Sequence, residues 1–279
     1  MSIRAIIKAF KSSTVINDGD MRLLRSLPTS SIESLGPFVF LDHYQHQSKR
    51  GIGDKPHPHA GIEVISYLLE GSVEHKDSLG NVDILNAGDS QFIKAGSGML
   101  HKETPLSGRH GLQLWTSLPS KNKFDKPEYY SYKSDKIPVL ELNGNTIKII
   151  AGNINGTEGV LHTTSPTVLT HIHFKTNNEV TLEVNKTFQL GVYVLQGSVM
   201  VGTQGPLVKG DLALLSDGEQ INLQPTGDLP IDIIVLGGEK ITEPLLFEGP
   251  FVMDSIENLQ LTQQNYISGK MGTLDGVPF

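Results

Sequence analysis

The 279-residue sequence contains no cysteine, and this absence excludes several kinds of site at once. Without cysteine the chain can form no disulfide, no thiolate nucleophile and no cysteine-bound zinc or iron–sulfur site. Any metal ion must therefore be bound by histidine and carboxylate side chains.

Long apolar segments and an excess of positive charge are also missing. The N-terminal residues contain no apolar segment followed by a small-residue cleavage site, and no apolar run approaches the ~20 residues that span a bilayer. We therefore expect a cytoplasmic protein without a membrane partner. Lys and Arg number 23 against 30 Asp and Glu, which gives a net charge of −7. This negative charge disfavours direct binding of nucleic-acid phosphates.

Glycine and proline, by contrast, are plentiful. The 29 Gly and 15 Pro residues favour many turns over long helices. Short apolar runs, for example residues 62–69, 190–195 and 231–236, each end in turn-forming residues and are typical of β-strands. We therefore expect an all-β fold.

One helix is predicted near the end of the chain, from about Ser255 to Ser268. Asp254 and Glu257 have the spacing of a capping box, and Gly269 provides a stop signal. The residues expected to form its buried face are Ile256, Leu259 and Ile267.

An internal repeat indicates two copies of one β-unit. Residues 67–73 read YLLEGSV and residues 193–199 read YVLQGSV, 126 positions later. A Gly-Asp turn follows each copy, at 88–89 and at 210–211. Repetition at this scale favours a duplicated barrel, for which we expect domains at 1–134 and 135–279.

The first half concentrates histidine and carboxylate residues in two short segments. PHPHAGIE contains His57, His59 and Glu63, and GSGMLHKE contains His101 and Glu103. In a strand, residues two apart point to the same face, so these side chains can converge inside one barrel. Three imidazoles and a carboxylate form a divalent-metal site of the nitrogen and oxygen type. The alternative is a set of exposed strand histidines.

The spacing of these residues resembles known motifs. Residues 51–71 follow G-x5-H-x-H-x3-E-x7-G, which is similar to the first cupin motif with a final spacing one residue longer, and Gly98-x-x-His101 resembles the second, with Pro105 in place of its terminal Asn. With FVFLDH (38–43), SYLLEGSVEHKDSLG (66–80) and EGPFVMDS (248–255), the chain from about residue 20 to about residue 272 resembles the pirin family.

The resemblance implies two tandem cupin (jelly-roll) barrels with a short C-terminal helix. It also implies one Fe(2+) per chain, or another divalent metal, in the N-terminal barrel at 1–134. The implied ligands are His57, His59, His101 and Glu103. Glu63 is a ligand in the general cupin motif, and here it is a reserve ligand or a residue that orients the others.

The second barrel, 135–279, is expected to be degenerate and without metal. The positions equivalent to the four ligands are Glu183, Asn185, Leu223 and Pro225. His171 and His173 alternate in THIHF, but no second His or carboxylate pair follows, so we interpret them as structural or solvent-facing.

His75, Asp77 and Ser78 lie in the segment EHKDSLGN, which has the composition of a hairpin turn. Two interpretations stay open for this segment. It either lines the rim of the metal site, or its Asp and Ser are ordinary turn formers that bond their own backbone.

The family resemblance implies an enzyme, a flavonol dioxygenase that acts on substrates such as quercetin with dioxygen and releases carbon monoxide. Glu103 is the candidate catalytic base, with Glu63 as its alternative. A hypothesis of a different class is a non-catalytic iron-binding regulatory protein that binds a protein partner according to its metal state. We expect a monomer in either case.

Overall fold

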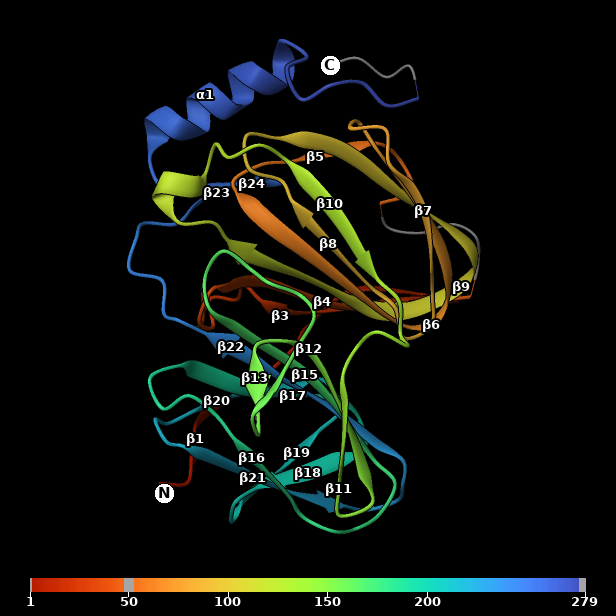
Figure 1. Ribbon diagram of the computed structural model, residues 1–279, viewed down its shortest axis with the longest axis vertical. Helices are drawn as coiled ribbons and strands as arrows, with labels where there is room; N and C mark the ends of the chain where they lie inside the picture. Colours follow the sequence, from red (N-terminus) through yellow and green to blue (C-terminus); the bar gives the residue numbers. More distant parts are fainter. Residues whose placement is uncertain (1, 48–52, 276–279) are drawn as a thin grey trace. The chain divides into compact units, whose positions relative to one another are not determined.

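The structure is a computed structural model that describes residues 2–47 and 53–275 (Figure 1). In this part of the chain it contains 24 strands, a single short 3-10 helix and one α-helix. The expectation of a β-rich chain with one helix near its end is therefore confirmed.

Two compact units share the chain. Unit 1 contains the residues up to Thr14, together with Leu24–Phe40 and Asp135–Ile241. Unit 2 contains Val15–Leu23, Leu41–Ser134 and the residues from Thr242 onward. The units are thus interleaved along the sequence, because segments near each chain end belong with strands distant in sequence. The domain ranges 1–134 and 135–279 for the two barrels stay a prediction.

Unit 1 contains three sheets. A seven-stranded sheet has the order β1-β20-β17-β22-β15-β12-β11, a four-stranded sheet has the order β16-β21-β18-β19, and β13 pairs with β14. The strands are β1 (Ile6–Lys11), β11 (Val139–Leu142), β12 (Asn145–Ala151), β13 (Asn153–Ile154), β14 (Thr157–Glu158), β15 (Thr167–Phe174), β16 (Val180–Glu183), β17 (Gln189–Gln196), β18 (Ser198–Val201), β19 (Gln204–Val208), β20 (Asp211–Leu215), β21 (Gln220–Thr226) and β22 (Ile231–Gly238).

The core of unit 1 is aliphatic. Alternate residues of both larger sheets point into it, among them Ile172 of β15, Val192 of β17, Leu182 of β16 and Leu223 of β21. All four are fully buried. Two sheets that share one apolar core form a closed barrel or sandwich.

Unit 2 is built around two long strands. β6 (Ile62–Asp77) and β9 (Met99–Ser117) pair antiparallel along almost their whole length. They lie in a nine-stranded sheet of order β10-β8-β6-β9-β4-β3-β2, in which β5 also pairs with β9 and β7 with β6. Three strands of this sheet have residues in both units, namely β2 (Ser13–Asp18), β3 (Met21–Leu27) and β4 (Phe38–His46). The other elements of unit 2 are β5 (His57–His59), β7 (Val82–Asn86), β8 (Ser90–Lys94), the 3-10 helix η1 (Ser120–Asn122), β10 (Glu128–Tyr132), β23 (Leu246–Glu248), β24 (Phe251–Met253) and α1 (Ile256–Ile267).

The helix α1 occupies the predicted residues but presents a different face. Its N-cap is Ser255, whose hydroxyl accepts from the Asn258 amide at 3.1 Å, so the cap lies one residue after the predicted Asp254. The predicted burial of Ile256 and Ile267 is wrong, since they are 60% and 74% exposed. The helix instead packs through Leu259, the fully buried Thr262 and Tyr266 onto a cluster that includes Phe251 and Met253.

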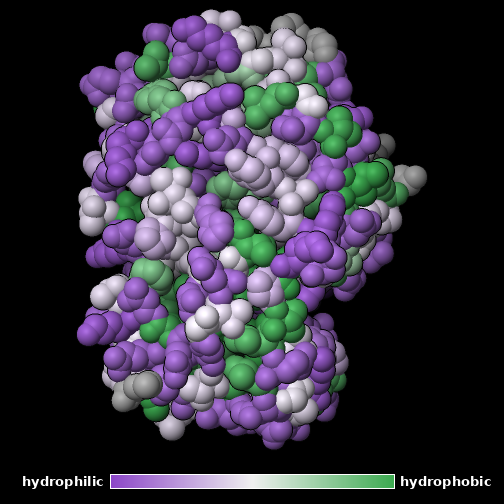
Figure 2. Space-filling model, in the orientation of Figure 1, coloured by the Kyte–Doolittle hydropathy of each residue, from purple (hydrophilic) through white to green (hydrophobic). Residues whose placement is uncertain are grey.

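No helix within residues 2–47 and 53–275 is both long and apolar enough to cross a membrane. On the face shown in Figure 2, hydrophobic residues form small groups among hydrophilic ones. Scattered groups of this kind are normal on protein surfaces.

Candidate metal centre

Three predicted ligands meet through the pairing of β5 with β9. His57 and His59 share one face of β5, and His57 lies directly opposite His101 of β9. One ring nitrogen from each of the three histidines lies within 4.8 Å of the other two. The centroids of the His57 and His101 rings are 4.4 Å apart, and those of His59 and His101 are 4.9 Å apart. The three histidines therefore lie together, as the alternation of side chains predicted, whereas Glu63 and Glu103 are not in this close cluster.

The ring nitrogens of this cluster could hold a metal ion. His59 and His101 are 2% and 1% exposed, and neither nitrogen of the His101 ring has a hydrogen-bonding partner within the described residues. A buried polar group without a partner costs about 1–3 kcal/mol, and a bound metal would give each ring a partner for one nitrogen. His57 differs, because its Nδ1 lies 2.9 Å from the carbonyl of Lys55, which leaves Nε2 to face the cluster.

The protonation of the cluster suits a metal as well. Burial lowers the pKa of His59 and of His101 well below 6.5, and the neighbouring imidazoles lower both further. Both rings are therefore neutral at physiological pH. A neutral imidazole is the form that coordinates a metal.

Glu103 follows two residues after His101 on β9 but is not a member of the close histidine cluster. Its Oε2 accepts from Arg109 Nη1 at 2.7 Å, and its Oε1 accepts from Ser66 Oγ at 3.0 Å and from Gln91 Nε2. Burial raises the pKa of Glu103, but the charge of Arg109 and these hydrogen bonds outweigh it, and the net pKa is lowered. An ionised carboxylate has about four acceptor sites, so three hydrogen bonds leave capacity for one more bond. Glu103 as a metal ligand stays a prediction.

Arg109 connects Glu103 to a buried polar network that the sequence analysis did not identify. Arg109 is 3% exposed, and its Nε donates to His46 Nε2 at 2.9 Å. Its guanidinium carbon lies 4.7 Å from the centroid of the Tyr44 ring. The signal available in the sequence was the presence of polar Ser66 and Gln91 inside otherwise apolar strands.

Glu63, the reserve ligand, also lies outside the close cluster. It is 1% exposed, and its Oε2 accepts from Thr116 Oγ1 at 2.7 Å. Thr116 is the cross-strand partner of Glu63 in the β6–β9 ladder. The carboxylate is therefore fixed by its own sheet.

The segment with His75 and Asp77 combines both interpretations that its sequence left open. Asp77 behaves as a turn former, because its Oδ1 accepts from the amides of Leu79 and Asn81. His75 is fully buried, lies 3.1 Å from Asp77 Oδ2 through Nε2, and has its ring centroid 5.6 Å from that of His101. The end of β6 thus lies beside the histidine cluster.

Aromatic rings surround the cluster. The His75 ring stacks on Tyr129 at 4.2 Å, and the Trp115 ring meets the His59 ring edge-on at 5.0 Å. Neither Tyr129 nor Trp115 was identified from the sequence, because their distance from the histidines along the chain hides their position.

The segment after His59 is anchored by a buried lysine. Lys123 is 1% exposed, and its Nζ donates to the carbonyl of Gly61 at 3.0 Å, to Ser117 Oγ at 2.8 Å and to the carbonyl of Val252 at 2.8 Å. Gly61 has a φ of +73°, and a Cβ there would lie 2.2 Å from the Val252 carbonyl oxygen. Glycine at this position lets β24 approach closely.

The equivalent positions of the second half carry different chemistry. Leu223 belongs to the aliphatic core of unit 1, where it lies opposite Val180 of β16. His171 Nε2 and His173 Nδ1 both lie beside Asp232 Oδ1, at 2.9 and 2.7 Å. This carboxylate partner, on the neighbouring strand β22, was not expected from the sequence.

Comparisons with known proteins agree with this architecture. The family model described as Pirin matches residues 20–116, and the one described as Pirin C-terminal cupin domain matches residues 169–272. Pirin from Homo sapiens is 31% identical over 257 residues, which cover 90% of this chain and 88% of that protein. A Pirin-like protein from Solanum lycopersicum is 30% identical over 261 residues, covering 92% of this chain and 89% of that protein.

A solved structure supports the same fold. The crystal structure of quercetin 2,3-dioxygenase from Acinetobacter baumannii aligns with a TM-score of 0.88 at 26% identity, covering 98% of this chain and 99% of that chain. The predicted all-β fold with two cupin barrels and a short C-terminal helix is confirmed.

Proposed function

This chain belongs to the pirin family, and from that membership we propose that it is a metal-dependent dioxygenase of flavonols such as quercetin. The observation that carries the proposal is the cluster of His57, His59 and His101, in which the buried His101 ring has two nitrogens without a hydrogen-bonding partner among the described residues. The likeness to a quercetin 2,3-dioxygenase structure supports the choice of substrate class.

His57, His59 and His101 would hold one divalent metal, proposed as Fe(2+), with Glu103 as the fourth ligand. Their donor set, neutral nitrogen with one carboxylate oxygen, fits iron and other first-row divalent metals. When bound, such a metal supplies a Lewis acid that lowers the pKa of the substrate hydroxyl and offers open positions to substrate and dioxygen.

The chain's own contribution to the chemistry centres on Glu103. Because Arg109 keeps the pKa of this carboxyl low, the group is ionised at neutral pH. An ionised carboxylate can accept the 3-hydroxyl proton of a flavonol, and we assign that role to Glu103. Ser66 and Gln91 donate to Oε1 and so hold the carboxylate in place. The overall reaction converts one flavonol and one dioxygen into a ring-opened product and carbon monoxide.

Flat aromatic substrates suit the surroundings of the cluster. Trp115 and Tyr129 contribute aromatic rings beside His59 and His75. Offset or edge-to-face contacts between such rings and a flavonol would each contribute about 0.5–1.5 kcal/mol beyond burial. The proposed partners are thus a small aromatic molecule and dioxygen, and a cytoplasmic location stays part of the proposal.

The test is oxygen uptake by the metal-loaded full chain. Metal-free protein is loaded with Fe(2+) without air and mixed with aerated quercetin in an oxygen electrode, while carbon monoxide is measured in the headspace. We expect uptake and carbon monoxide well above an equal amount of free iron. His101→Ala should abolish both, and His162→Ala, whose side chain is 71% exposed in unit 1, should abolish neither. Metal binding without uptake would contradict the proposal and favour the regulatory alternative.

A further inference from the structure

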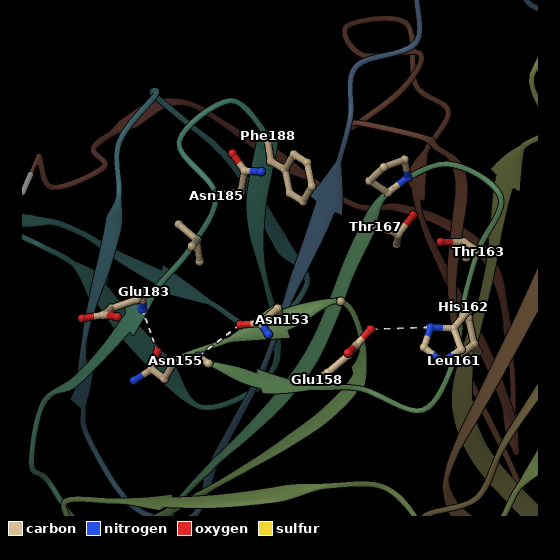
Figure 3. Close-up of a pocket in the computed structure, with 14 residues that line it drawn as sticks. Asn153, Asn155, Glu158, Leu161, His162, Thr163, Thr167, Glu183, Asn185 and Phe188 are labelled. Atoms are coloured by element: carbon tan, nitrogen blue, oxygen red, sulfur yellow. Dashed lines mark hydrogen bonds and ion pairs between the residues drawn. The ribbon is translucent and has the colours of Figure 1, made fainter.

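A pocket lies in unit 1, in the half of the chain that is expected to be without metal. It has a volume of about 560 Å³ (Figure 3). The lining comes from segments that adjoin strand ends, namely the β13–β14 hairpin after β12, the approach to β15 and the loop from β16 to β17. The aliphatic core of the unit fills the space between its sheets. A ligand would therefore bind at the end of the strands, which is a usual place for sites in β-barrels.

The charge of the lining excludes anionic ligands. No lysine or arginine contributes to it, whereas Glu158 and Glu183 do. The two carboxylates differ in direction. Figure 3 shows the Glu183 side chain pointing away from the other labelled groups, while Glu158 points toward His162, with 3.9 Å between Oε1 and Nδ1. Glu158 is therefore the acidic side chain directed toward another lining side chain, and it can accept a hydrogen bond from a neutral ligand.

Three asparagines present oriented amide groups. Each uses its side-chain oxygen to accept from a backbone amide: Asn153 from Gly156 at 3.1 Å, Asn155 from Glu183 at 2.7 Å, and Asn185 from Thr187 at 3.0 Å. A hydrogen bond to the side-chain oxygen fixes the plane of the amide, and the NH2 group is then left to donate elsewhere. The described contacts leave the NH2 groups of Asn153 and Asn185 as donors, and the Glu158 carboxylate as an acceptor.

One wall of the pocket is apolar. Phe188 is half-buried and packs partly against the core of unit 1, and its ring faces the opening in Figure 3. Leu161 and Val184 add aliphatic surface to the lining. A ligand that fits must therefore present an apolar face to Phe188 and hydrogen-bonding groups around its edge.

We propose that this pocket binds a neutral sugar in its pyranose form. A pyranose has an apolar face of C–H groups that can lie on the Phe188 ring. Its edge carries hydroxyls that can accept from Asn153 and Asn185 and donate to Glu158. This site is separate from the histidine cluster, and the inference does not depend on the dioxygenase activity.

The experiment uses the full chain and three free sugars, D-glucose, D-galactose and D-mannose, in ligand-detected saturation-transfer NMR followed by calorimetric titration. We expect millimolar binding of at least one sugar, with the strongest transfer to the protons of one ring face. Phe188→Leu keeps most of the packing and removes the aromatic face, and Asn153→Ala removes one donor. Each should weaken binding about tenfold or more.

The matched control is Asn177→Ala, because Asn177 is an exposed asparagine of the same unit outside the pocket. It should bind like the unaltered chain, and the melting temperatures of all variants should confirm that they fold. Absence of transfer to all three sugars at millimolar concentration overturns the proposal. So does unchanged binding in both pocket variants. Binding of choline, a cationic probe, in place of the sugars would assign the pocket to amines and equally overturn it.

Discussion

Replacing Lys123 by Met should change how the stability of the protein depends on pH. Burial lowers the pKa of Lys123 to about 8 from the ordinary 10.5, although Asp254 and Glu243 oppose the shift. The unfolded chain therefore binds this proton more tightly than the folded chain. Between about pH 8 and 10.5 the unfolded state carries more protons, so the free energy of unfolding rises with pH in this window.

The magnitude follows from the two pKa values. At about 1.4 kcal/mol per pH unit, the interval from about 8 to 10.5 corresponds to at most about 3 kcal/mol. This contribution is fully present above pH 10.5 and is lost as the pH falls through 8. Lys123→Met has no such proton, so the stability difference between the two proteins should grow by up to about 3 kcal/mol across the window.

At pH 7 the variant should already be less stable. The substitution removes three hydrogen bonds from Nζ, to Gly61, Ser117 and Val252, and hydrogen bonds from a charged donor contribute about 1.5–3 kcal/mol each. Relief of the buried charge offsets part of this loss, so we expect a net cost of about 2–4 kcal/mol.

The assay is urea unfolding of the metal-free proteins in steps from pH 7 to pH 10.5. Lys121→Met serves as the control, because Lys121 is exposed and lies two residues away in η1. Its stability should follow that of the unaltered chain at every pH. A difference between unaltered protein and Lys123→Met that stays constant with pH would refute the reasoning.

Two further predictions concern the histidine cluster, and a third concerns Glu103. His57→Ala or His101→Ala should lose the one bound metal per chain, measured by elemental analysis after dialysis, and a second metal in the unaltered protein would contradict the single site. Because burial lowers the pKa of His59 and His101 well below 6.5, their neutral forms persist in mild acid, and bound metal should be retained below pH 6.5 in equilibrium dialysis. Loss of metal with a midpoint at pH 6.5 would contradict the expected retention. Glu103→Gln should lose most oxygen uptake and, by leaving Arg109 buried without its carboxylate, lower the free energy of unfolding by about 3–5 kcal/mol in urea. Full uptake in this variant would remove Glu103 from its assigned role.

The sequence predicted the histidine cluster well because that prediction needed only local geometry. The alternation of side chains along β5 places His57 and His59 on one face, and the pairing with β9 brings in His101. The shared face follows from the period of a strand, whereas the pairing with β9 is a tertiary contact that the expectation of a single barrel supplied.

The surroundings of Glu103 could not be predicted in this way. Arg109 follows six residues later on the same strand, which in a straight strand would place it about 20 Å away. The β6–β9 ladder, however, shifts register between Leu68 and Glu70 and again between Gly71 and Val73. Bulges of this kind bend a strand, and here Arg109 Nη1 lies 2.7 Å from Glu103 Oε2. Bulges leave no reliable signal in a single sequence.

The prediction of which face of α1 is buried was wrong for a related reason. The spacing of Ile256, Leu259 and Ile267 is compatible with one helical stripe, but the position of β24 decides which stripe is covered. Of the three predicted residues only Leu259 packs there, together with Tyr266. Tertiary packing therefore overrode the local hydrophobic pattern.

The interleaving of the two units has a consequence for biosynthesis. β1 pairs with β20, so Lys11 leaves the ribosome 200 residues before its partner Asp211. Ala60 of unit 2 likewise forms a parallel bridge with Phe251, which is synthesised about 190 residues later. Neither unit can therefore complete its strand pairing during the first half of translation, although domains commonly fold in order as they emerge. His59 immediately precedes Ala60, so the final surroundings of the histidine cluster form only when the nascent chain is nearly finished.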